Sequence, residues 1–139
     1  MKTRTITLLL SLTLFVRLQL TAATKAIEYT ATAFEDHYSL AYDELSKDLP
    51  SALEHADVAV TIADSIGSAD ELARSYYLLG YIYHIQDDIV NAFKYYVGAS
   101  LFYEQLGDIV QYQKLLDNAV LIAHEYGVFV VGENFATKR

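Results

Sequence analysis

The chain has 139 residues, with 18 acidic against 10 basic side chains and a formal net charge of −8. It contains no cysteine, which excludes disulfide scaffolds, thiolate zinc sites and cysteine nucleophiles. The charge argues against nucleic-acid binding, which needs clustered Lys and Arg, and the 53% of hydrophobic residues favours one ordered domain.

The first residues have the organisation of a secretory signal peptide. Lys2 and Arg4 precede an apolar run at residues 6–16, and small residues ending at Ala23 permit signal-peptidase cleavage. The run is shorter than the roughly 20 residues that a helix needs to cross a bilayer. We therefore expect an exported protein, periplasmic or secreted, that loses residues 1–23 and keeps no membrane span. An uncleaved signal anchor and an ordinary N-terminal helix are the alternatives.

The rest of the chain predicts helices in succession. Apolar residues recur at intervals of three and four between Phe34 and Leu45, which indicates one stripe of a first helix from residue 24. Pro50 suits the first turn of a second helix. That helix ends at Gly67, because glycine readily adopts the left-handed conformation that closes helices.

Three further helices follow between turn signals. Ser68 with Glu71 three residues later has the capping-box pattern, which indicates the start of a third helix. Asp87 and Asp88 can cap a fourth, and their acidity is accounted for by this position rather than by acid–base chemistry. The remaining helices are expected at about 68–86, 89–106 and 109–126, with an irregular tail at 128–139.

A shift of 40 positions superimposes residues of the same kind. It brings Ala52 onto Ala92 and Ala59 onto Ala99, and the glycines that end helices coincide as well. Small residues at these places allow two antiparallel helices to approach closely, and larger ones would force them apart. The packing positions of the clearest period are Tyr76, Leu79, Gly80, Tyr83, Ala92, Tyr96 and Ala99.

This pattern resembles the tetratricopeptide repeat, in an exported bacterial form whose repeats are longer than the family's usual period. The match is best over residues 73–106, where Tyr76 and Tyr96 stand at the family's usual Trp and Phe positions. Upstream, Leu40 falls at the glycine position, which a slip of about one residue in the connecting turn would explain. The resemblance implies an all-α fold of antiparallel helix-turn-helix repeats, stacked as a short right-handed superhelix of about two and a half repeats in residues 24–127.

The resemblance also implies a protein that binds a peptide or protein partner in its concave groove. We expect no cofactor and no metal. The first helix of each pair lines that groove, which places eight residues there: Arg74, Tyr77, Tyr81, His84, Lys114, Asp117, Leu121 and His124. Tyrosine gives contact area at low entropic cost, and Arg74 can pair with a carboxylate in bidentate fashion. The alternative is a solvated inner surface whose tyrosines pack on neighbours. As a groove residue, Arg74 is expected to contribute little to melting.

The sequence carries no catalytic or metal-binding motif of the GxSxG, P-loop, GxGxxG or HExxH type, so we expect no enzyme. His37 and His55 are each expected to stand alone. A second functional hypothesis is the extracytoplasmic sensing segment of a truncated signalling protein, a histidine kinase or transcriptional regulator. The apolar residues 128–131 are expected either to fold back on the fifth helix or to promote self-association through the ends of the array.

Overall fold

The computed structural model describes residues 2–126, and the side chains of residues 12–25 and 30–126. These residues form helices joined by turns, with no strand: α1 (Lys2–Glu44), α2 (Leu49–Ile66), α3 (Ala69–Ile85), α4 (Ile89–Gln105) and α5 (Ile109–Glu125). The predicted all-α class is therefore confirmed, and α2 to α5 begin and end within about a residue of the expected positions. The expected tail at 128–139 lies outside the described residues.

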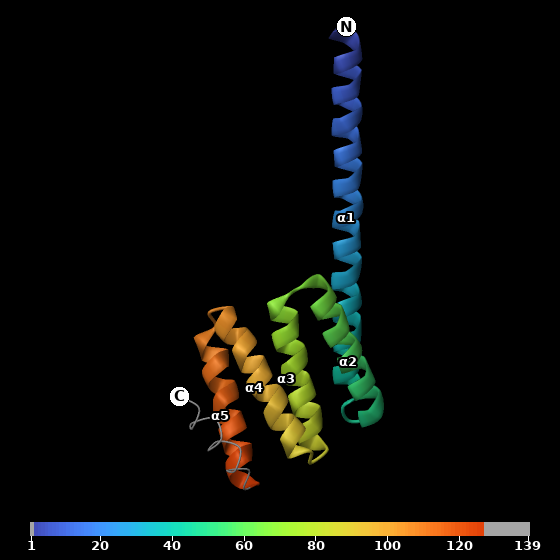
Figure 1. Cartoon of the computed structure of the whole chain (residues 1–139). Coiled ribbons are helices and arrows are strands. Elements are labelled where there is room, and N and C mark those ends of the chain that lie inside the picture. Colours follow the sequence, from blue (N-terminus) through green and yellow to red (C-terminus); the bar gives the residue numbers. More distant parts are fainter. Residues whose placement is uncertain (1, 127–139) are drawn as a thin grey trace.

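The long helix α1 differs most from expectation. It was predicted to begin after residue 23, but it is continuous from Lys2 to Glu44. Its N-terminal half projects away from the other helices (Figure 1), and the described apolar side chains from Leu12 to Leu20 are more than half exposed. Its helical backbone is in keeping with its many leucines and with the absence of glycine and proline from residues 2–44. Across the described residues, no helix combines the length and the apolar character that a membrane span requires.

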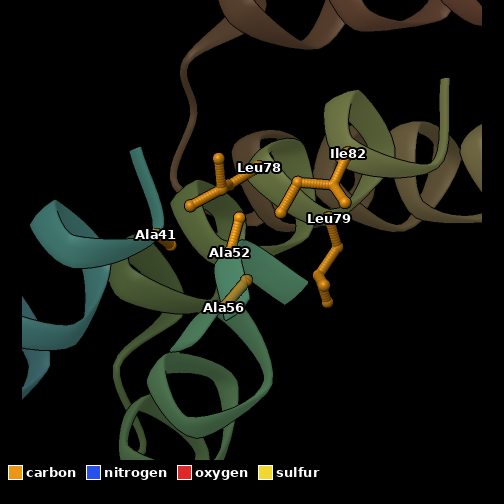
Figure 2. Packing of buried hydrophobic residues seen from close by; sticks show 6 residues of the cluster. All are labelled: Ala41, Ala52, Ala56, Leu78, Leu79 and Ile82. Atoms are coloured by element: carbon orange, nitrogen blue, oxygen red, sulfur yellow. The ribbon is translucent and has the colours of Figure 1, made fainter. Parts of the chain in front are cut away.

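Consecutive helices run antiparallel, and each packs mainly on its neighbours along the chain (Figure 1). The core between the first three helices combines small residues of α1 and α2 with branched residues of α3, as Figure 2 shows: Ala41, Ala52, Ala56, Leu78, Leu79 and Ile82. All six are at most 1% exposed. The alanines let α1 and α2 approach closely enough for α3 to cover both.

A second cluster joins α3, α4 and α5. Its buried members lie on α4 and α5: Ala92, Tyr96, Ala99, Leu115, Ala119 and Ile122. Tyr76 and Tyr83 of α3 pack against it while remaining partly exposed. Helices from neighbouring pairs therefore share one continuous packing scheme, in which α3 contributes side chains to both clusters.

The turns between helices recur at half of the 40-residue period found within the sequence. Each helix from α2 to α5 has an N-cap whose side-chain oxygen accepts a hydrogen bond, at 3.1–3.5 Å, from the backbone N–H three residues later. These caps are Asp48, Ser68, Asp88 and Asp108. The same satisfaction of free N–H groups therefore starts every helix after the first.

The residue before three of these caps has a positive φ: 67° at Gly67, 62° at Asp87 and 74° at Gly107. Around Gly67, the N–H of Gly67 donates to the carbonyl of Asp64, and the N–H of Ser68 donates to that of Ala63. These paired bonds define a Schellman motif, and the other two turns have the same pairing. The expected closure of the second helix at Gly67 is thus observed.

Candidate binding face

Two adjacent hollows lie along α3, and Tyr77 lines both. The first, which we call the apolar hollow, has a volume of about 190 Å³ and is lined by Tyr77, Tyr81, His84, Tyr96, Asn118, Leu121 and Ile122. The second, the tyrosine hollow, has a volume of about 230 Å³ and is lined by Tyr38, Tyr42, Tyr77, Tyr103, Gln111, Lys114 and Leu115. Together they form a face to which α1, α3 and α5 all contribute.

Two phenol groups of the tyrosine hollow, those of Tyr42 and Tyr103, are held in their neutral form. Burial raises the pKa of Tyr42, and a hydrogen bond with Tyr38 raises it further. Burial also raises the pKa of Tyr103. The rings of Tyr38 and Tyr42 meet edge to face, with centroids 5.2 Å apart. Neutral hydroxyls can donate as well as accept hydrogen bonds, so this hollow suits a polar ligand.

Lys114 is the cation that lines the tyrosine hollow, and no acidic residue lines it. In the apolar hollow, burial raises the pKa of Tyr96 to about 12, so this ring also stays uncharged near neutrality. Tyr77 and His84 both lie near the Tyr96 ring, with centroid separations of 5.9 and 6.4 Å. The apolar hollow is therefore walled by aromatic rings on the α3 and α4 side, and by Asn118 and aliphatic side chains on the α5 side.

Arg74 is engaged within the protein rather than presented to a ligand. Its Nη1 donates to Oε1 of Glu35 at 2.6 Å, and its Nη2 donates to Oε2 at 3.0 Å. The guanidinium also lies over the rings of Tyr38 and Phe34, at 4.4 and 5.2 Å from their centroids. These hydrogen bonds lower the pKa of Glu35, although partial burial opposes the effect. Arg74 thus links α3 to α1. That it contributes little to melting stays a prediction.

The structure brings together five of the eight predicted groove residues. Tyr77, Tyr81, His84 and Leu121 surround the apolar hollow, and Lys114 lies in the tyrosine hollow. Asp117 and His124 are exposed on α5 and are not among the residues that line either hollow.

Apart from Tyr96, which lines the apolar hollow, the predicted packing residues are not among those that line either hollow. A Cβ atom built on Gly80 would be 2.7 Å from Cδ1 of Tyr96, so α3 and α4 approach closely there. Tyr83 stacks on Tyr95, with centroids 5.4 Å apart and planes at 4°. Ala92 and Ala99 are fully buried, and Leu79 is 1% exposed. Tyr76 meets Tyr95 and Phe102 edge to face.

Sequence reasoning missed the contribution of α1 to the site. Tyr38 and Tyr42 precede Tyr77 and Tyr81 by one position less than the period that aligns the later helices, and Ala41 precedes Gly80 by the same shorter offset. A search at the full period cannot find them. Ala41 is fully buried while Leu40 is 42% exposed, which agrees with the slip of one residue expected upstream. A comparison at the shorter offset would have placed both tyrosines on the same face.

Two further expectations concern histidine and metal. His37 and His55 do not stand alone: their Nδ1 atoms are 3.0 Å apart, within hydrogen-bonding distance. The spacing along the chain gave no sign of this pair, because the two residues lie on different helices at non-equivalent positions. In the described part of the chain, no group of three or more His, Cys, Asp or Glu residues is placed to hold a metal ion.

A third hollow, of about 440 Å³, lies along α2. It is larger than the other two, but residues of this one helix alone line it: Pro50, Leu53, Glu54, Asp57, Val58 and Thr61. A concavity that a single helix lines offers few directions from which a ligand can be held. We therefore regard the face around Tyr77 as the stronger candidate.

In comparisons with known proteins, no protein-family model, curated protein or solved structure matches the chain.

Proposed function

We propose that the chain is an exported tetratricopeptide-type interaction module that binds an extended peptide segment of a partner protein across α1, α3 and α5. The observation that carries the proposal is the pair of hollows on either side of Tyr77, lined by side chains from these three helices and from α4. The repeated caps and the antiparallel helix pairs support a stacked array, in which the first helix of each pair faces the groove.

An extended peptide suits this face better than a compact small molecule. Two separate hollows that share one wall can each take a side chain, while the backbone between them crosses Tyr77. Tyrosine rings offer rigid contact area, and their neutral hydroxyls can bond peptide carbonyls and N–H groups. Because Arg74 is paired with Glu35, affinity in this proposal comes mainly from the aromatic walls rather than from a guanidinium clamp.

The export part of the proposal concerns the N-terminal half of α1. Its described apolar side chains lie away from the bundle, and their exposure is explained if this segment serves targeting and is then removed. Residues 30–44 of α1, by contrast, contain Phe34 and Ala41, both fully buried, and supply the packing of the first pair.

Panning a random-peptide display library against the full chain tests the proposed groove. Counter-selection on the double variant Tyr77→Ala/Tyr81→Ala removes peptides that bind elsewhere, and calorimetry then gives Kd for the selected peptides. We expect Tyr77→Ala to weaken binding about tenfold or more, since it removes a wall of both hollows. Thermal melting of each variant establishes that it remains folded.

Thr61→Tyr is the matched control, because it would fill the hollow on α2 and leave the face around Tyr77 intact. Binding that survives Tyr77→Ala but is abolished by Thr61→Tyr would move the site to α2. Failure to select any peptide that discriminates the double variant from the wild type would reject a peptide groove on this face.

A further inference from the structure

His37 of α1 and His55 of α2 form a pair that the proposed groove does not use. Their Nδ1 atoms are 3.0 Å apart, and the ring centroids are separated by 5.2 Å with an interplanar angle of 43°. Both side chains are half-buried, so the pair is fixed by its surroundings and still open to solvent. Neither ring lines the hollows around Tyr77.

The pair is held by well-packed helix segments rather than by loops. On one side, Ala41 packs in the same cluster as Ala52 and Ala56. On the other side, Phe34 packs with Ala59. All five residues are fully buried. The backbones of α1 and α2 are therefore held in place on both sides of the histidine pair. A site on such elements keeps its geometry without ordering a flexible segment.

The chemistry of the contact is that of a shared proton. When two imidazole nitrogens are at hydrogen-bonding distance, one carries the N–H and the other offers its lone pair. When the donor ring instead carries its proton on Nε2, both rings stay neutral and both Nδ1 atoms have a free lone pair in one small region of space. Neutral imidazole nitrogen is a preferred ligand of Zn²⁺, Cu²⁺ and Ni²⁺, so a cation of this class can take the place of the proton.

The separation of the two nitrogens also matches coordination of one ion. Imidazole nitrogens bind Zn²⁺ at about 2.0–2.1 Å, so two of them are about 2.9 Å apart at a right angle and about 3.3 Å apart at the tetrahedral angle. The observed 3.0 Å lies between these values. The ring centroids are 5.2 Å apart, so the two rings face each other almost end to end along the line between the nitrogens. Binding therefore requires both rings to turn, so that their lone pairs meet at an ion beside that line.

We propose that His37 and His55 form a two-histidine site for a divalent late transition-metal ion, Zn²⁺ or Cu²⁺, at the α1–α2 interface. Water completes the coordination, since no third His, Cys, Asp or Glu joins the pair among the described residues. The bound ion cross-links the first two helices and stabilises the folded state, because the unfolded chain does not hold the two rings together.

Thermal melting of the untagged full chain after EDTA treatment and dialysis tests the site, with Zn²⁺ or Cu²⁺ as the probe. We expect Tm to rise by several degrees, about 4 °C at ten times the Kd, in the wild type. The rise should be lost in His55→Gln and retained in His84→Gln and His124→Gln. These controls matter because a chain of net charge −8 attracts cations to its carboxylates in general.

Electron paramagnetic resonance of the Cu²⁺-loaded chain gives a readout that does not depend on stability. The wild type should show coupling to two imidazole nitrogens, and His37→Gln and His55→Gln should each lose one of them. The metal-free melting curve of each variant shows whether it folds. An unchanged Tm in the wild type, a shift that persists in His55→Gln, or a spectrum that neither substitution alters would overturn the proposal.

Discussion

Gly80 and Gly98 each lie beneath a tyrosine ring of the facing helix. A Cβ on Gly80 would be 2.7 Å from Cδ1 of Tyr96, and one on Gly98 would be 2.7 Å from Cδ2 of Tyr76. The two tyrosines differ in their freedom to move, because Tyr96 is 4% exposed whereas Tyr76 is only half-buried. The same added methyl group therefore meets a fixed ring at one position and a movable ring at the other.

We predict that Gly80→Ala lowers the free energy of unfolding by up to about 2 kcal/mol. Overpacking against Tyr96 costs about 1–3 kcal/mol, and the better helix propensity of alanine returns part of it. Gly98→Ala is the matched substitution and should cost less, since Tyr76 can turn toward solvent. Urea denaturation shows which of the two variants loses more free energy of unfolding. An equal loss would mean that the ring above Gly80 is as free to move as the ring above Gly98.

The repeated geometry of the turns belongs to the scale of the helices. Gly67, Asp87 and Gly107 occupy equivalent places in three turns, and all three have a left-handed backbone. Asp87 is the non-glycine residue with positive φ in the described chain. Left-handed backbone costs a residue with a Cβ more than it costs glycine, although aspartate tolerates it better than most. The α3–α4 turn is therefore the strained member of the set.

We predict that Asp87→Gly raises the free energy of unfolding by about 0.5–1 kcal/mol and that Gly107→Asp lowers it by a similar amount. Asp87 also raises the pKa of Tyr126 through a hydrogen bond, but that contact lies in solvent and its loss should not cancel the gain. Chemical denaturation of the two variants measures both changes. Destabilisation by Asp87→Gly would show instead that the aspartate side chain is needed to hold the turn.

The helix ends could be predicted because capping residues and glycines act locally. Ser68 caps α3 through a bond from the N–H of Glu71, and Gly67 closes α2, as their sequence pattern predicts. The start of α1 could not be predicted from the cleavage pattern at Ala23. That pattern is recognised by a peptidase and does not stop a helix, since the residues on both sides of it favour helical backbone.

At the scale of the whole molecule, the sequence could predict the face of α3 that contains Tyr77 but not the helix that completes the site. Tyr38 and Tyr42 belong to a register one position shorter than the period of the later helices, so a comparison at that period passes over them. The pairing of Arg74 with Glu35 and of His37 with His55 depends on how helices rotate against one another. That rotation is set by packing of the buried alanines and leucines together, and no single spacing encodes it.

The Arg74–Glu35 pair links α3 to α1, two helices that are not consecutive along the chain. Arg74 donates two hydrogen bonds to Glu35 and lies over the ring of Tyr38, so three groups stabilise one arrangement of the first two helix pairs. Glu35 is 54% exposed at its side chain, and solvent screening limits such a pair to about 1 kcal/mol or less. Its contribution is small but depends on pH in a defined direction.

We predict that the wild type loses more stability than Glu35→Gln as pH falls from about 5 to 3. Arg74 lowers the pKa of Glu35 in the folded state, so the stabilisation is fully present above the unfolded pKa of about 4.3 and is lost as pH falls through the lower folded value. The other carboxylates are present in both proteins, so the difference in Tm between the wild type and Glu35→Gln isolates the contribution of the Glu35 carboxylate. Glu54→Gln, at an exposed position of α2, serves as the control. Its Tm should fall between about pH 5 and 3 by as much as that of the wild type. Parallel Tm curves for the wild type and Glu35→Gln would mean that the pair does not link α1 and α3 in solution.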